Sequence, residues 1–272
     1  MNEPSGATEM AHAEPKYSRV HRAAEIVSIL IFVVYAVANL WRLFATAIPT
    51  GPSAWLVLAG GAFLGYVLAD FISGTVHWLA DRYGSRDLFL LGPNFIGPFR
   101  DHHVRPKEIT QHDFVETNGN NCMISFWVLM VVYHGVPLAV GDLTSLFLAG
   151  ALVFSMMAIM ATNQFHKWAH SDSAPRLVRL LQRWHAILPA DHHDVHHKAP
   201  FETYFCITTG WLNWPLRKLR FYESVEWLVY RLTGIRAGED DAINAGLAPA
   251  RASEAESGVV TLPSTGAAER AS

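Results

Sequence analysis

The sequence predicts an all-α integral membrane protein, in which four transmembrane helices carry a histidine-rich cap on one side of the membrane. Hydrophobic residues make up 51% of the 272 residues, which is more than an ordinary soluble domain contains. Four stretches are long enough to cross a hydrocarbon core of about 30 Å, which takes roughly 20 apolar residues. The chain also contains 14 histidines, and many of them form tight clusters close to these stretches.

The predicted transmembrane helices cover residues 26–47, 54–72, 122–140 and 143–161. The segment Pro49-Thr50-Gly51-Pro52 is a turn signal, so the first two helices should form a hairpin. Gly61-x-x-x-Gly65 in the second helix favours close packing against another helix. These glycines lie mid-span with no strand before them, so they do not predict a phosphate-binding loop.

The predicted membrane domain extends over residues 21–236. The segments on either side, residues 1–20 and 237–272, are rich in small and polar residues without an apolar period, and such composition predicts disordered tails. No internal repeat is present.

The distribution of basic residues predicts the orientation in the membrane. All Lys and Arg residues except Arg42 lie before the first span, in the 81–121 region or after residue 166. Because Lys and Arg are retained in the cytoplasm, both termini and the long central loop should be cytoplasmic. The net charge of −3 indicates no particular partner, and we expect no nucleic acid. Cys122 and Cys206 are too few for a disulfide framework.

Four clusters of potential metal ligands all fall on the predicted cytoplasmic side. They are His77-x-x-x-Asp81, His102-His103, His166-x-x-x-His170 and His193-x-x-His196-His197. Residues four apart share one face of a helix, so His77 with Asp81, and His166 with His170, can each bind one metal from a single helical turn. At least two of His193, His196 and His197 also share a face. A tetrahedral zinc takes three or four protein ligands, and these nine suit two metal ions. Imidazole binds iron, copper, zinc or nickel, so the residue types alone leave the metal open.

Other polar residues close to the clusters are candidates for supporting roles. We expect His112, His185 and His192 to hydrogen-bond to ligands rather than to bind metal themselves. Asp70 precedes His77 by seven residues, so it faces the same way, about 10.5 Å along a helix. An ionisable residue inside a membrane helix is a functional candidate, although Asp70 would serve equally well as a packing partner for a hydroxyl or amide.

The motifs around these residues resemble the plasmanylethanolamine desaturase (Kua-type) family, from about residue 54 to 236. The motifs are Asp70-Phe-x-Ser-Gly-x-x-His77-Trp-x-x-Asp81, Phe99-Arg100-Asp101-His102-His103, His112-Asp-Phe-x-Glu116-Thr-Asn-Gly-x-Asn121-Cys122, Asn163-Gln-x-His166-Lys-Trp-x-His170, His193-x-x-His196-His197 and Glu202-Thr-Tyr-Phe-Cys-Ile-Thr-Thr-Gly-Trp-Leu-Asn213. A plastid lipid desaturase family is a more distant relative.

This resemblance implies an O2-dependent enzyme with two iron ions, bound by the nine clustered residues. Its reaction would dehydrogenate the 1-O-alkyl chain of an ether phospholipid and give the vinyl ether of a plasmalogen. The bond to be oxidised lies beside the head group, so a metal centre at the membrane surface reaches it without a deep tunnel. Glu116, Asn118, Asn121 and Lys198 are polar residues at the level of the clusters, so we expect them either to orient the phospholipid head group or to cap helices and hydrogen-bond within loops.

The chain has no dinucleotide fingerprint, haem-attachment motif or cysteine quartet for an iron–sulfur cluster. Electrons should therefore come from a separate carrier of the cytochrome b5 or ferredoxin type, together with its reductase. Basic residues near the clusters would either attract such an acidic carrier or only reflect the retention of Lys and Arg in the cytoplasm. They are Arg100, Arg105, Lys107, Lys167 and Lys198.

Two other functions stay open at this stage. One is desaturation or hydroxylation of a phospholipid acyl chain near its ester. The other, from a different class, is a membrane metal transporter or sensor. Transporter ligands tend to lie at the middle of the bilayer on broken helices, whereas the predicted ligands here lie at one membrane surface.

Overall fold

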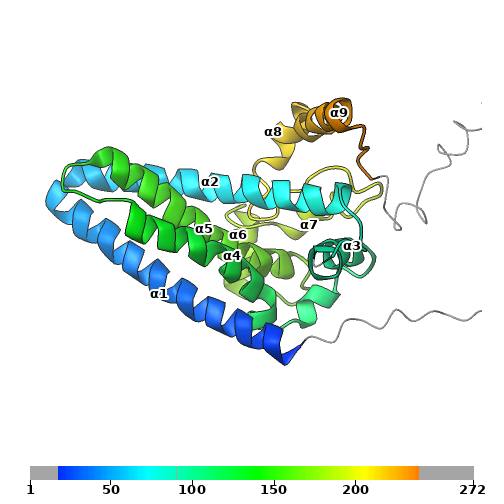
Figure 1. The fold of residues 1–272 in the computed structure, drawn as a ribbon, viewed down its shortest axis with the longest axis horizontal. Helices are drawn as coiled ribbons and strands as arrows, with labels where there is room; N and C mark the ends of the chain where they lie inside the picture. Colours follow the sequence, from blue (N-terminus) through cyan, green and yellow to red (C-terminus); the bar gives the residue numbers. More distant parts are fainter. Residues whose placement is uncertain (1–17, 90, 239–272) are drawn as a thin grey trace, which may run out of the picture.

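Four long helices form the body of the computed structural model, which describes residues 18–89 and 91–238 (Figure 1). They are α1 (Arg19–Thr50), α2 (Pro52–Arg82), α4 (Phe114–Gly135) and α5 (Leu143–Ala169). In the bundle α2 packs on α5, α5 on α4, and α4 on α1. Every regular element within the described residues is a helix, so the predicted all-α class is confirmed.

Three of the four predicted spans meet the requirements for crossing a membrane. The helices α1, α2 and α5 are long and apolar enough to do so. The fourth, α4, begins with several polar residues and ends at Gly135, five residues before the predicted end of its span. Pro137 explains this earlier end, because a proline disfavours the helical conformation in the residue before it, and Val136 is extended.

The hairpin between α1 and α2 has a single residue at its turn. Helix α1 continues through Pro49 to Thr50, and α2 starts at Pro52, where a proline fits because its missing N–H is not needed. Gly51 between them has φ +99°, a backbone conformation open to glycine and strained for other residues. The predicted hairpin is therefore present, and its turn is tighter than the sequence signal suggests.

Helices α2 and α5 approach until their backbones touch. A Cβ added at Gly61 would lie 2.7 Å from the Phe147 carbonyl oxygen, and one at Gly65 would lie 2.4 Å from that of Ala151. Side chains larger than glycine do not fit at either position. The close packing predicted from the glycine spacing is confirmed.

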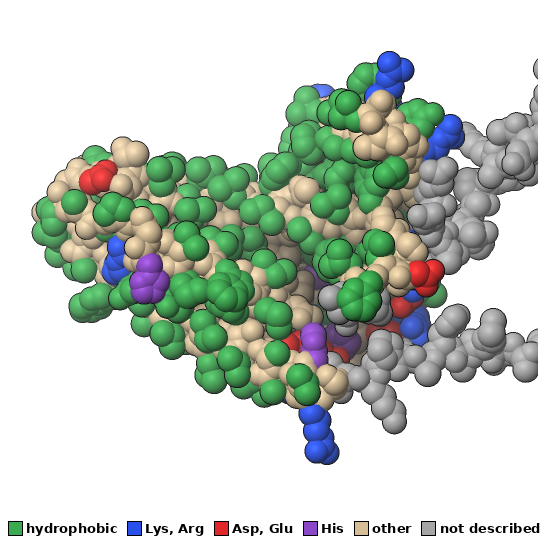
Figure 2. Space-filling model, viewed as in Figure 1, with side chains coloured by type: hydrophobic (Ala, Val, Ile, Leu, Met, Phe, Trp, Pro, Cys, Tyr) green, Lys and Arg blue, Asp and Glu red, His purple; other side chains and the backbone are tan. Residues whose placement is uncertain are grey.

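The outer surface of the bundle is apolar. Large hydrophobic side chains face outward from three of the long helices, for example Val37, Phe63 and Val131, which are each more than 60% exposed. Figure 2 shows hydrophobic side chains spread over the bundle, whereas most of the visible charged ones gather at the end with the short helices. An apolar surface of this extent is suited to lipid contact.

The short helices lie toward one end of the bundle, where α2 and α5 extend past their predicted spans (Figure 1). They are η1 (Gly92–Ile96), α3 (Gly97–Val104), η2 (Glu108–Gln111), α6 (Arg176–Arg183), α7 (Ala190–His193), α8 (Asn213–Lys218) and α9 (Phe221–Thr233). The beginning of α1 lies toward this end too. Apart from their inner ends, the predicted tails at 1–20 and 237–272 lie outside the described residues.

Candidate metal centre

Nine potential metal ligands lie in two groups at this end of the bundle. Within each group, one ligand atom from every residue lies within 4.8 Å of all the others. The carboxylate group is His77, Asp81, His103 and His196, and the imidazole group is His102, His166, His170, His193 and His197. The structure thus brings together all nine residues selected from the sequence and divides them into two sets.

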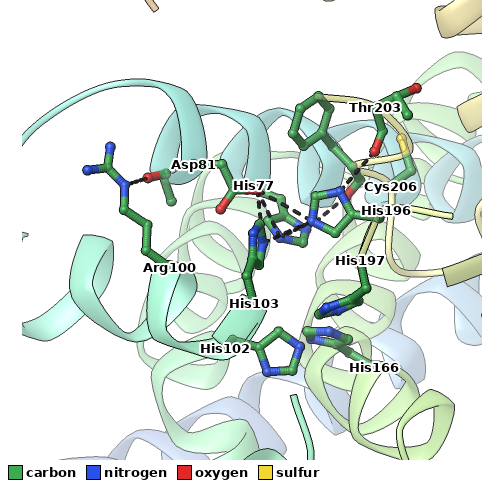
Figure 3. Close-up of polar contacts among 12 residues, drawn as sticks. His77, Asp81, Arg100, His102, His103, His166, His196, His197, Thr203 and Cys206 are labelled. Atoms are coloured by element: carbon green, nitrogen blue, oxygen red, sulfur yellow. Dashed lines mark hydrogen bonds and ion pairs between the residues drawn. The ribbon is translucent and has the colours of Figure 1, made fainter. Parts of the chain in front are cut away.

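Four segments of the chain supply the two groups (Figure 3). Helices α2 and α5 each contribute a pair with i, i+4 spacing from the end of the helix. On α3, the successive residues His102 and His103 point about 100° apart, so they enter different groups. His193 is the last residue of α7, and in the turns that follow it the N–H groups of His196 and His197 both donate to its carbonyl oxygen. These turns bring His197 into the imidazole group with His193 and His196 into the carboxylate group.

The carboxylate group is compact and buried. The Nε2 atom of His196 lies 3.1 Å from the Nε2 atoms of both His77 and His103. Asp81 Oδ2 lies 3.3 Å from the Nε2 atom of His77 and 3.4 Å from those of His103 and His196. Since His77 and His196 are 0% exposed and Asp81 is 5% exposed, bulk water has little access to these atoms.

Two backbone carbonyl groups fix the orientation of two rings in this group. His77 Nδ1 lies 3.1 Å from the carbonyl oxygen of Phe205, and His196 Nδ1 lies 2.8 Å from that of Thr203. A carbonyl oxygen only accepts hydrogen bonds, so each neutral ring carries its proton on Nδ1 and a lone pair on Nε2. The two Nε2 lone pairs then face each other, which is repulsive unless a cation lies between them. The residues therefore fit a metal ion.

The imidazole group consists of neutral nitrogen donors alone. The Nε2 atom of His170 lies 2.9 Å from that of His102 and 3.2 Å from that of His166, and the Nε2 atoms of His193 and His197 are 3.0 Å apart. Burial, with a smaller effect of neighbouring imidazoles, lowers the pKa of His170 to about 4 and that of His197 to about 3. It also lowers the pKa of His102 and His193. Neutral imidazole is the form that binds metals.

Comparison with known proteins identifies the family of this chain. Residues 66–240 match the lipid desaturase domain, and this range contains all nine clustered residues. The chain belongs to the lipid desaturase family. It is therefore an oxidoreductase, and the resemblance drawn from the motifs is confirmed.

Individual members of the family are similar over most of the chain. Plasmanylethanolamine desaturase of Myxococcus xanthus is 47% identical over 225 residues, 83% of this chain and 78% of that protein. Plasmanylethanolamine desaturase 1 of Mus musculus is 47% identical over 184 residues, 66% of this chain and 68% of that protein. Chloroplastic fatty acid desaturase 4 of Arabidopsis thaliana is 33% identical over 181 residues, 66% of this chain and 53% of that protein. No solved structure matches this lipid desaturase.

One loop of the lipid desaturase, residues 203–213, holds the rings of the carboxylate group, and sequence reasoning did not find this function. The loop supplies the two carbonyl groups that bind Nδ1 of His77 and His196. Its conformation includes Tyr204 at φ +64°, which is uncommon for a residue other than glycine. The loop lies within a motif of the family, but backbone carbonyls have no side-chain signature in a sequence.

Asp70 on α2 anchors this loop. Its side chain is fully buried and accepts three backbone hydrogen bonds, from Thr209 at 2.7 Å, Gly210 at 2.9 Å and Leu212 at 3.1 Å. The side chain of Asn213 adds two bonds to the backbone of Cys206, at 2.8 and 2.9 Å. A buried carboxylate is stable when it accepts this many hydrogen bonds, so Asp70 and the loop stabilise each other.

The three histidines expected to support the ligands contact other groups. His192 Nε2 lies 3.0 Å from the carbonyl oxygen of Gly210, so this ring also contacts the anchored loop. The carbonyl oxygen of His185 accepts a bond from the Trp211 indole. The Nε2 atom of His112 lies 3.7 Å from a carboxylate oxygen of Glu116.

Arg100 corrects one expectation from the sequence. It is 2% exposed, and its guanidinium donates to the carbonyl oxygens of Ala80, Tyr83 and Gly84 at 3.1 to 3.2 Å. These bonds cap the end of α2 and fix α3 against it (Figure 3), so Arg100 is not available for docking an electron carrier. The local sequence does not distinguish a buried cap from a surface charge.

The other basic residues expected at a docking surface differ in their contacts. Lys107 pairs with Asp172, and Arg105 pairs with Glu108. Lys167 donates to the carbonyl oxygen of His112. Ion pairing and hydrogen bonding reduce the positive potential that these three side chains offer to a partner.

The residues expected to orient a head group lie in two places. Asn118 is buried and donates to Gln164 Oε1 at 3.4 Å, and Asn121 donates to the carbonyl oxygen of Ile159 at 2.7 Å. Both amides therefore bind α4 to α5. Glu116 is partly exposed near the start of α4, and Lys198 is exposed directly after the imidazole group.

Proposed function

We propose that this lipid desaturase is a plasmanylethanolamine desaturase, which converts the 1-O-alkyl chain of an ether phospholipid into the vinyl ether of a plasmalogen. The observation that carries the proposal is the double group of nine ligands, which lies within the region that is 47% identical to two proteins of that name. Two adjacent carbons each lose a hydrogen atom, and O2 with two external electrons and two protons is reduced to two waters.

We assign one iron ion to the carboxylate group and one to the imidazole group. Histidine with a single carboxylate is a donor set that iron accepts, and nine ligands exceed what one ion needs. When bound, the iron ions supply the activation of O2 that removal of hydrogen from an unactivated carbon requires. The nine side chains are then the metal ligands, and Asp81 is the one that carries a negative charge.

Other residues keep these ligands in place. The carbonyl groups of Thr203 and Phe205 hold His196 and His77 in the tautomer that presents Nε2 to a metal, as supporting hydrogen bonds do in other metal sites. Asp70 acts through the loop 203–213, so it is a positioning residue. His192 contacts the same loop at Gly210, and the backbone of His185 contacts it at Trp211.

The position of the two groups suits the bond to be oxidised. His77 lies five residues past the predicted end of its span, or about 7.5 Å along the helix. This is the level of phospholipid head groups, next to which the ether oxygen lies. The proposed orientation has four spans, including α4, with both termini and both groups on the cytoplasmic side, where soluble electron carriers are available.

The remaining substrate contacts are proposals that follow from position. Lys198 directly follows a ligand and is exposed, so its ammonium group is suited to the head-group phosphate. On α4, the partly exposed Glu116 is the residue suited to contact the head group, whereas Asn118 and Asn121 hold α4 against α5 and act on the substrate only through that packing. The electron donor is a separate carrier of the cytochrome b5 or ferredoxin type with its reductase.

Lipid analysis tests this function directly. The gene is expressed in cells that contain alkyl ether phospholipids but no vinyl ethers, and extracted lipids are analysed by mass spectrometry before and after mild acid. We expect acid-labile vinyl ethers with the native chain and none with His196→Ala. The chloroplastic fatty acid desaturase relatives favour a second candidate, desaturation of an acyl chain. New acyl double bonds without vinyl ethers would support that candidate instead.

A further inference from the structure

The segment 211–235, here called the C-terminal arm, lies along the outside of α2 (Figure 1). It contains α8 and α9. Near its start, the Trp211 ring centroid lies 5.7 Å from that of Tyr66. Further along, the ring of Tyr222 stacks on that of Trp78 at 5.2 Å, and α9 is joined to the end of α2 by an ion pair between Glu226 and Arg82 at 2.9 Å.

The contacts place α9 at the level where α2 leaves the hydrocarbon core. Helix α2 has 31 residues, so it is about 46 Å long at 1.5 Å per residue. The hydrocarbon core is only about 30 Å thick, and the last third of α2 must project from it. Because α9 contacts α2 from Phe71 to Arg82, it lies beside this projecting third.

One edge of α9 is apolar and exposed. The side that faces α2 carries Tyr222 and Val225, which contribute to a small core. Leu228 and Leu232 follow Val225 at helical spacing, yet they are 49% and 76% exposed. These two leucines therefore extend the apolar side of α9 beyond its contact with α2. Glu223 lies about 180° from Leu232 around the helix, on the polar side. Hydrophobic side chains crowd the visible surface of the arm (Figure 2).

Basic side chains accompany this apolar edge. The arm contains Arg217, Lys218, Arg220 and Arg231, against Glu223 and the Glu226 that pairs with α2. Lys218 and Arg231 lie over the exposed rings of Trp214 and Trp227, at 4.8 and 5.7 Å from the ring centroids. Helices that lie in the membrane interface typically combine exposed Trp and Leu with Lys and Arg, as this arm does.

We propose that the C-terminal arm lies in the head-group layer of the membrane. Leu228 and Leu232 enter the acyl boundary, and the basic side chains contact anionic lipid head groups. Since Glu226 and Tyr222 fix the arm to the turns of α2 that carry His77 and Asp81, the arm sets the depth of the carboxylate group relative to the lipid. Continuity with the apolar surface of α2 favours lipid over a protein partner.

A spin label on α9 tests this proposal without relying on enzyme activity. The native cysteines Cys122 and Cys206 are buried, so the variants Leu232→Cys and Glu223→Cys offer single exposed thiols on opposite sides of one helix. The labelled full-length protein is placed in phosphatidylcholine nanodiscs. Accessibility to O2, which is concentrated in lipid, is compared with accessibility to a water-soluble nickel complex.

We expect the ratio of O2 to nickel accessibility to be several-fold higher at position 232 than at 223. Equal exposure to nickel at both positions would overturn the proposal, because the arm would then be in water. Exclusion of both reagents at 232 would also overturn it, because another protein or a second copy of the chain would then cover this edge.

Charge is tested with the same label. Nanodiscs made of equal parts phosphatidylcholine and phosphatidylglycerol should move the label at 232 deeper than phosphatidylcholine alone. The double variant Arg217→Gln, Lys218→Gln should abolish this shift, whereas Arg19→Gln, an exposed charge at the start of α1, should leave it intact. A shift that persists in the double variant would remove the anionic-lipid part of the proposal.

Discussion

The carboxylate group and the imidazole group differ in charge, burial and supporting contacts. The first contains a carboxylate, and two of its imidazole rings are fully buried with Nδ1 held by backbone carbonyls. The second has only neutral donors, and three of its rings are half-buried. Within the described residues, Nδ1 of His193 and of His197 has no hydrogen-bond partner.

Two candidate metal sites built mainly from histidine are therefore not equivalent. A fixed tautomer and a negative charge both favour a bound cation, so the carboxylate group should bind its iron more tightly. Fewer supporting bonds leave the imidazole group freer to rearrange its ligands.

The largest effect is expected for His196→Ala. The His196 ring lies next to both other imidazoles of the carboxylate group, those of His77 and His103. Its removal therefore takes away the nitrogen that lies between the other two. Vinyl ether formation should fall below detection, while the protein stays in the membrane, because the long helices do not depend on the metal. His134→Ala is the matched control, since this ring bonds Tyr35 away from both groups. Native-like activity of His196→Ala would exclude it as a ligand.

Asp81→Asn should affect the two groups differently. The change keeps the size of the side chain but removes the charge, so iron should leave the carboxylate group and remain in the imidazole group. Metal analysis should find about half of the native iron, and activity should fall by more than the roughly 10- to 100-fold typical of a lost supporting residue. Unchanged iron content would mean that Asp81 orients a ring instead of binding metal.

Asp70→Asn should weaken the carboxylate group through the loop 203–213. In the variant, an amide NH2 group would face a backbone N–H group that now donates to the Asp70 carboxylate. Two donors repel each other, so the loop would shift together with its two carbonyl groups. Activity should fall roughly 10- to 100-fold, and a chelator should remove the more tightly bound iron faster. A purely structural role predicts instead a lower thermal stability with native rates of iron release.

The smallest effect is expected for Ser73→Ala. Ser73 Oγ accepts bonds of 3.3 Å from the Ile207 N–H and 3.1 Å from the Thr208 hydroxyl, which are weak additions to the same loop. Their removal should cost about 1 kcal/mol and change activity no more than a few-fold. A loss as large as that of Asp70→Asn would show that the loop depends equally on both anchors.

The sequence was sufficient to select the nine clustered residues, and the three-dimensional arrangement was needed to divide them. Spacing and Lys/Arg distribution predict that they lie on one side of the membrane, and the structure brings all nine together. The assignment of His102 and His103 to different groups depends on the rotation of α3 about its axis. No residue pattern reports that rotation.

Two other features were beyond sequence reasoning for physical reasons. The exposure of Arg100 depends on where α3 packs, so its charge was misread as a docking surface. Asp70 and His77 contact the same loop, but the partners of Asp70 are backbone N–H groups, which no side-chain pattern reports. The early end of α4 was foreseeable from Pro137 alone.

The contact between α2 and α5 has a consequence for chain-length selectivity. Where a Cβ at Gly65 would already lie 2.4 Å from a carbonyl oxygen, no hydrocarbon chain can pass between the two helices. A substrate chain is therefore excluded from this seam, and we place its distal part in the bilayer among other lipids. We expect the enzyme to accept alkyl chains that differ in length and in distant unsaturation, and to discriminate mainly at the glycerol end.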